Sequence, residues 1–262
     1  MANDEGWATD FEDQSVEITG ARVGPGFVYL PAATPLVACG LRSMANQALT
    51  KQVTDAERAL GLDVQLAIVL ATTPIGCDSL FYVPVENDIL GIGYANTNGA
   101  EVFDEDLESG LEGIAFLNDW PYWEQEFEEF RTAFLHEIGH RWGARVDARR
   151  EGVNYRLTGR EGGHWSYFLD SGGSPLEGNR FDPEARMRTA TPALRLDYSP
   201  LDLYLMGVLE PDAVGPIHLL HHAAAEGLDC AGYTVSAASP PQTCKTNMLS
   251  GDWVELQIED VI

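Results

Sequence analysis

The chain has 262 residues, 45% of them hydrophobic, so it can bury one large core or two small ones and is not disordered as a whole. Its formal net charge of −25, from 41 acidic and 16 basic residues, repels nucleic acid and anionic membranes, and we expect neither as a partner. No stretch has the roughly 18 apolar residues that a spanning helix needs, so membrane insertion is not expected.

Four cysteines, at 39, 77, 230 and 244, lack the C-x-x-C spacing of metal and redox motifs. We favour disulfides Cys39–Cys77 and Cys230–Cys244, which predict an extracellular, cell-surface or periplasmic protein. Four buried thiols in a cytosolic protein are the alternative. The N-terminus lacks the basic and apolar segments of a signal peptide, and the chain stops after a strand-like segment, so we expect a natural protein that extends further at both ends.

The first half of the chain predicts one helix and several short strands. Residues 1–35 form an acidic N-terminal extension, with strand candidates at 16–19 and 27–30. A helix over 41–60 should end at Gly61, since glycine commonly closes a helix. Apolar runs at 63–70, 81–85, 89–94 and 113–117 predict strands, and a turn is expected at 118–119. These elements predict an α+β fold with a small mixed sheet.

A helix over 122–142 carries the pattern H-E-x-x-H, because apolar residues precede it at helical spacing. His136 and His140 lie one turn apart, so both imidazoles leave the same face and can bind one divalent metal, most plausibly Zn²⁺. Glu137 lies beside the metal and is the candidate general base. A chance occurrence of the pattern is the alternative.

The second half of the chain is less regular. Residues 143–163 predict a hairpin or extended loop, and the turn-rich segment 170–179 is either a solvated loop or a Ca²⁺ site. A helix over 199–207 should be capped by Ser199 or Asp197 and end at Gly207. Residues 216–262 are expected to form a peripheral C-terminal segment that ends in a strand pair.

A catalytic zinc site needs a third protein ligand. His164 is the first candidate, because the glycines before it let the chain turn back towards the helix. Asp147 is an alternative third ligand, as is a downstream carboxylate such as Asp202. The remaining histidines, at 218, 221 and 222, are expected to be solvated surface residues.

The motif from His136 to Gly143 resembles the zincin metallopeptidases, and its glycine resembles the metzincin branch. The segments HEIGHRW, GHWSYFLD, SPLEGN and YSPLDLYLMG also resemble a group of bacterial extracellular proteins of predicted zinc-peptidase type, over about residues 60–215. Two positions depart from the metzincin pattern: Val146 replaces its third histidine, and Leu176 stands where a methionine below the metal is expected. The resemblance implies that Asp202, on the closing helix, supports the site.

The resemblance implies a catalytic domain over 36–215, with a cleft between 36–142 and 143–215 and an irregular C-terminal subdomain that contains the closing helix. The implied activity is that of a monomeric zinc endopeptidase, in which Glu137 activates the water that attacks a peptide bond of a protein or peptide substrate. Tyr198, Tyr204 and Tyr155 are candidate donors to the oxyanion. Two alternatives stay open: a zinc hydrolase acting on another bond, and a weakly active or inactive binding or adhesion module that retains the metal site.

Overall fold

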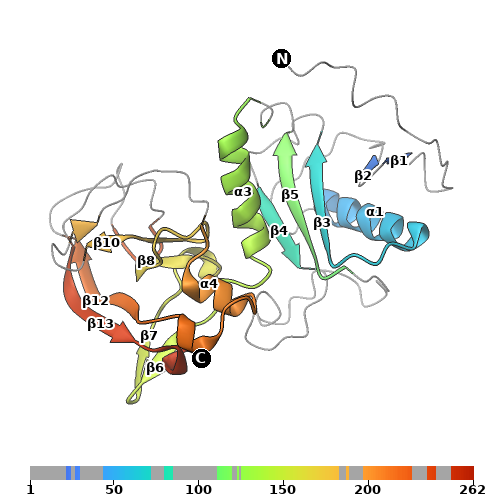
Figure 1. The fold of residues 1–262 in the computed structure, drawn as a ribbon. Coiled ribbons are helices and arrows are strands. Elements are labelled where there is room, and N and C mark those ends of the chain that lie inside the picture. The colour runs from blue at the N-terminus through green and yellow to red at the C-terminus, as the bar shows by residue number, and fades with distance from the viewer. Residues whose placement is uncertain are drawn as a thin grey trace. The chain divides into compact units, whose positions relative to one another are not determined.

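The computed structural model describes residues 22–24, 27–29, 44–71, 80–84, 111–119, 123, 125–182, 187–188, 197–225, 235–239 and 249–262. The strands predicted at 16–19 and 89–94, and all four cysteines, lie outside these residues, so the disulfide prediction stays a prediction. The chain divides into two compact units, one comprising Met1–Glu86 and Ala100–Pro121 and the other Asn87–Gly99 and Tyr122–Ile262. Figure 1 shows the elements of both.

Among its described residues the first unit has one helix and a small mixed sheet, as predicted. Helix α1 ends before Gly61, whose φ of +59° is the left-handed conformation expected of a closing glycine. The sheet has the order β3-β5-β4, with β5 parallel to β3 and antiparallel to β4. Its bounds and those of its neighbours are β1 Arg22–Gly24, β2 Phe27–Tyr29, α1 Met44–Leu60, β3 Leu66–Ala71, β4 Phe81–Pro84 and β5 Gly113–Asp119. Strand β5 thus continues through 118–119, where a turn was expected.

The second unit contains the helix α3, which carries the H-E-x-x-H motif, and a four-stranded sheet of order β13-β12-β8-β9. Helix α3 is shorter than predicted, and a hairpin of β6 and β7 lies within the predicted 143–163 segment. The elements are α3 Phe127–Gly139, β6 Ala148–Arg150, β7 Val153–Tyr155, η2 Arg160–Gly162, β8 Trp165–Asp170, β9 Glu177–Asn179, β10 Phe181–Asp182, β11 Met187–Arg188, α4 Pro200–Leu205, β12 Ile217–Ala225 and β13 Leu249–Leu256.

Strand β8 is the centre of the second unit, and it was not predicted. Trp165, Ser166, Tyr167 and Leu169 are all buried, and because successive residues of a strand point to opposite faces, both faces of β8 are buried. Its sequence alternates between apolar and polar residues except at Phe168, so the pattern was compatible with a strand. Residues 216–262, which the sequence assigned to a peripheral segment, supply β12 and β13, and Ile217 and Leu256 belong to the same core cluster as Trp165.

Helix α4 begins as predicted, with Ser199 as its cap. The Ser199 hydroxyl accepts a hydrogen bond from the Asp202 N–H at 3.1 Å, and the Asp202 carboxylate accepts one from the Ser199 N–H at 2.7 Å. Gly207, with φ of +72°, follows the end of the helix. In the described residues no helix combines the length and apolar character needed to cross a membrane. The fold is therefore α+β, with few helices and small sheets.

Candidate metal centre

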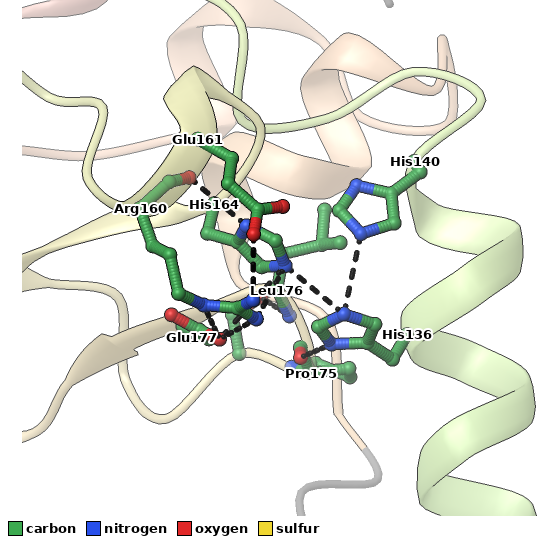
Figure 2. Close-up of polar contacts among 9 residues, drawn as sticks. His136, His140, Arg160, Glu161, His164, Pro175, Leu176 and Glu177 are labelled. Carbon is green, nitrogen blue, oxygen red and sulfur yellow. Dashed lines mark hydrogen bonds and ion pairs between the residues drawn. The ribbon is translucent and has the colours of Figure 1, made fainter. Parts of the chain in front are cut away.

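Three histidines converge in the second unit, as Figure 2 shows. His136 lies in the last turn of α3, His140 is the C-cap residue four positions later, and His164 directly precedes β8. The His136 Nε2 atom lies 3.2 Å from the Nε2 atoms of both His140 and His164. The possible ligand atoms of the three residues all lie within 4.8 Å of one another. The third ligand candidate chosen from the sequence, His164, is thus the residue that completes the cluster.

Backbone carbonyls fix the orientation of two of these rings. His136 Nδ1 lies 2.7 Å from the Pro175 carbonyl, and His164 Nδ1 lies 3.0 Å from the Arg160 carbonyl. Because a carbonyl can only accept a hydrogen bond, both Nδ1 atoms carry the hydrogen in the neutral ring, and both Nε2 lone pairs point into the cluster. Facing lone pairs at 3.2 Å repel each other unless an electrophile lies between them. The donor set therefore fits a divalent metal, and three imidazoles are a known ligand set for catalytic zinc.

The rings are kept neutral, which metal binding requires. Burial, together with the neighbouring His164, lowers the pKa of His136 to about 4. Burial, together with the Arg160 charge, lowers the pKa of His164 to about 4. Burial also lowers the pKa of His140 well below its usual value. His140 is 7% exposed and His164 is 4% exposed. At neutral pH all three imidazoles are therefore free of the proton that would compete with a metal.

Glu137 is buried beside these rings. The residue is 4% exposed, and the charges of Arg160 and Glu161 act on its carboxyl group. Burial raises its pKa to about 8, opposed by the Arg160 charge, so without a metal the carboxyl group is mostly protonated at pH 7. A nearby divalent cation favours the ionised form. The carboxylate would thus become available as a base when a metal is bound.

These pKa shifts predict that the metal-free protein loses stability in acid. Between about pH 6.5 and pH 4.5 the unfolded chain protonates its histidines, whereas the folded site keeps all three neutral. Glu137 acts in the opposite direction, because the folded state takes up its proton at higher pH than the unfolded state does. Three histidines outweigh one carboxyl, so the free energy of unfolding should fall as the pH falls through this window.

Urea unfolding in the presence of a chelator, measured at several pH values, tests this expectation. Glu137→Gln removes the opposing contribution and should make the decline with acid steeper. A free energy of unfolding that is constant, or that rises towards pH 4.5, would contradict the lowered histidine pKa values.

The segment 174–177 forms the support beneath the histidines. Leu176 is fully buried, and it lies so close to α3 and the turn after it that a Cβ atom on Gly143 would stand 2.2 Å from Leu176 Cδ1. A Cβ atom on Gly139 would stand 3.1 Å from the same side chain. Both glycines of the motif therefore allow the leucine, at the expected methionine position, to pack directly against the helix end. The same segment presents the Pro175 carbonyl to His136.

Gly143→Ala is expected to destabilise the protein by about 1–3 kcal/mol, because the added Cβ atom would force the fully buried Leu176 side chain to shift. Gly152→Ala is not a suitable control, since Gly152 has a positive φ of its own. The double variant Gly143→Ala/Leu176→Ala should lose less stability than the sum of the losses in the two single variants, because alanine at position 176 removes the clash with the new Cβ atom. Thermal unfolding of the four proteins measures this coupling, and additive effects would contradict the clash.

Asp202 connects helix α4 to the segments on either side of β8, and its support of a metal site stays a prediction. Its carboxylate accepts hydrogen bonds from the Trp165 indole N–H at 2.7 Å and from the Ser199 hydroxyl at 2.7 Å, and a further one from Ser174. Trp165 follows His164 in sequence, and Ser174 precedes the segment that carries Pro175. Burial raises the pKa of Asp202. Asp202 is therefore a buried connector between two parts of the site and is not in the histidine cluster.

The other residues proposed from the sequence are not members of the histidine cluster. Asp147 accepts hydrogen bonds from Leu157 and Thr158, with its Oδ1 atom 2.9 Å from the Leu157 nitrogen, so it anchors the following hairpin. The Tyr198 hydroxyl donates to the Leu135 carbonyl at 2.5 Å. Tyr155 belongs to the hydrophobic core, and Tyr204 packs against it. None of these four residues belongs to the group that could hold the metal.

Two further predicted sites can be placed. On β12 and β13, His218 lies 3.7 Å from Glu255 and His222 lies 3.1 Å from Asp252. In the 170–179 segment, Asp170 accepts a hydrogen bond from the Gly172 N–H at 3.1 Å. Over the stretches that the structure describes, the three-histidine group is the one set of three or more His, Cys, Asp or Glu residues close enough to share an ion. A Ca²⁺ site in this segment stays a prediction.

Sequence reasoning missed two charged residues at the centre of the site. The Arg160 Nη2 atom lies 2.9 Å from His164 Nε2 and 2.6 Å from a Glu177 carboxylate oxygen (Figure 2). The parallel pairing of β8 with β9, which matches Trp165 with Glu177, brings these groups together. No local pattern in the sequence indicates that pairing.

Comparison with known proteins gave no match to any family model, to any curated protein or to any solved structure.

Proposed function

We propose that the protein is a zinc-dependent endopeptidase of the zincin type, with Zn²⁺ held by His136, His140 and His164. The observation that carries the proposal is the convergence of three neutral imidazoles, together with the buried carboxyl group of Glu137, which follows His136 on the same helix. Three protein ligands leave a fourth position open, as in catalytic zinc sites. When bound, zinc lowers the pKa of a coordinated water towards about 7 and polarises a carbonyl group.

Residues of the chain would orient the metal ligands and transfer the proton. The Pro175 and Arg160 carbonyls hold two of the rings in the tautomer that presents Nε2. Glu137 accepts a proton from the attacking water and passes it to the nitrogen of the departing amine, as a general base and then a general acid. A metal with a purely structural role has no need of such a carboxyl group. Its presence favours a hydrolase over an inactive binding module.

Zinc content and proteolysis measured on the same sample test the proposal. The protein, after removal of metal and dialysis against Zn²⁺, should contain one zinc ion per chain and cleave a fluorescently labelled unfolded protein. Removal of zinc with a chelator should abolish the cleavage, and Zn²⁺ should restore it. If the protein binds zinc but cleaves no protein or peptide in a broad library, the endopeptidase is excluded. A zinc hydrolase of another bond and a binding module that retains the metal would remain.

A further inference from the structure

Arg160 is held at the metal centre by a buried acidic partner. Its Nε and Nη2 atoms lie 3.2 and 2.6 Å from the same Glu177 oxygen, and Nη1 lies 3.3 Å from Glu161. The Glu177 side chain is only 6% exposed, whereas that of Arg160 is 35% exposed. Glu177 and Glu161 both have positive φ, of 75° and 57°, a conformation that residues other than glycine rarely adopt. The chain thus accepts strained backbone at both acids that contact this guanidinium group.

The second partner of Nη2 is the ligand atom of His164. Because His164 Nδ1 donates to the Arg160 carbonyl, the Nε2 atom has a lone pair and accepts the hydrogen bond from Arg160 at 2.9 Å. One lone pair can accept that hydrogen bond or bind a metal, but not both. A metal held by the three histidines therefore requires the N–H of Arg160 to leave His164.

The displaced N–H group stays beside the site. Glu177 is bonded to the guanidinium group through Nε and through Nη2, so the loss of the contact with His164 leaves two hydrogen bonds in place. The freed hydrogen then lacks an acceptor in a partly buried position, where an unmade hydrogen bond is costly. An oxygen atom with negative charge, bound at the open position of the metal, would be its natural acceptor.

We propose that Arg160 is the residue that binds the anionic oxygen of a ligand at this site, released for that role when a metal takes the lone pair of His164. The inference rests on the proposed zinc site. In hydrolysis the acceptor is the oxygen of the attacked carbonyl group, on which negative charge develops. Carboxylates, including those of acidic substrates and of peptide products, are ligands of the same chemistry. The positive charge of Arg160 thus favours anionic groups at the site despite the net charge of −25 on the whole chain.

The geometry favours Arg160 over the tyrosines considered for this role. The Tyr198 hydroxyl already donates to the Leu135 carbonyl, and Tyr155, a core residue, meets the ring of His221 edge-on. Arg160 donates directly to a ligand atom of the cluster.

Two measurements test the inference. Calorimetry gives the affinity of the zinc-loaded protein for acetate, and competition with a chelator gives the affinity for zinc. Arg160→Gln alone leaves Glu177 buried without its partner, so the decisive variant is the double change Arg160→Gln/Glu177→Gln, which keeps the pair neutral. Arg131→Gln is the matched control, because Arg131 forms an exposed pair with Glu128 on α3. Arg160→Lys keeps the charge but loses the fork of donors.

The double variant should bind acetate about tenfold or more weakly than the wild type, as expected for the loss of a charged hydrogen bond. It should bind zinc as tightly as the wild type or more tightly, because no hydrogen bond at His164 has to be broken. Arg160→Lys should lie between the two, and Arg131→Gln should match the wild type.

If the double variant binds acetate within twofold of the wild-type affinity, the inference is overturned and the zinc site is unaffected. The same holds if the zinc-loaded wild type binds no acetate. Zinc affinity lowered more than tenfold in the double variant would show that Arg160 supports the metal site. It would overturn the inference that the metal displaces Arg160 from His164. A wild type that binds no zinc would refute the proposed function itself and the inference with it.

Discussion

Replacing Glu137 by glutamine is expected to leave one zinc ion per chain and to lower the rate of hydrolysis by about 10²–10⁴-fold, the range in which a positioned acid–base group contributes. Glutamine has nearly the shape of the carboxyl group but cannot take up a proton. Burial raises the pKa of Glu137 to about 8, so in the metal-free protein at pH 7 the glutamine also matches its charge. The fold should therefore tolerate the change, and the loss of activity should appear mainly in kcat.

The measurement is kcat and KM on a fluorogenic peptide, with zinc content determined on the same preparation. Glu128→Gln is the matched control, because Glu128 lies on the same helix and pairs with Arg131 on its exposed face. This control should retain wild-type kcat. Full activity in Glu137→Gln would remove Glu137 as the base, whereas loss of zinc in that variant would show that Glu137 belongs to the metal site.

Sequence periodicity was sufficient to predict the half of the site that is local in the chain. His136, Glu137 and His140 lie within one turn and a half of α3, and helical geometry alone determines which of them share a face. The capping of α4 by Ser199 is local for the same reason. In each case the interacting groups lie within four residues of one another.

The other half of the site depends on contacts between distant segments. His164 could be selected because few histidines exist in the chain and glycines precede it, but the position of Arg160 and Glu177 could not be anticipated. Their contact depends on the pairing of β8 with β9, which joins two segments separated by a turn-rich loop, so no local pattern in the sequence indicates it. Charged residues in a turn-rich segment are usually solvated, so their types alone gave no signal.

The resemblance to metzincins predicts a closing helix with a supporting aspartate and a methionine below the metal, and both roles stay predictions. Asp202 bonds with Trp165, Ser199 and Ser174, so it joins α4 to the start of β8 and to the segment after it. Leu176, which stands where the pattern has methionine, lies close to Gly139 and Gly143.

His164→Ala is expected to weaken zinc binding by more than a hundredfold. Loss of a partner outside the ligand set typically costs about 10–100-fold in metal affinity, and loss of a ligand should cost more. The fold around the site should persist, because Trp165 remains bonded to Asp202 and buried in the core. Removal of a buried imidazole also removes a group that the unfolded chain protonates in acid, so the metal-free variant should lose less stability than the wild type between about pH 6.5 and pH 4.5.

Competition with a chelator measures the zinc affinity, and His218→Ala is the matched control, since His218 lies on β12 beside Glu255 and outside the histidine cluster. Asp147→Asn should likewise keep zinc, because the Asp147 carboxylate serves the hairpin and not the metal. Zinc affinity unchanged in His164→Ala but lost in Asp147→Asn would move the third ligand to the alternative residue. An ion bound between the Nε2 atoms of His136 and His164 requires that zinc affinity be lost in His164→Ala and kept in Asp147→Asn.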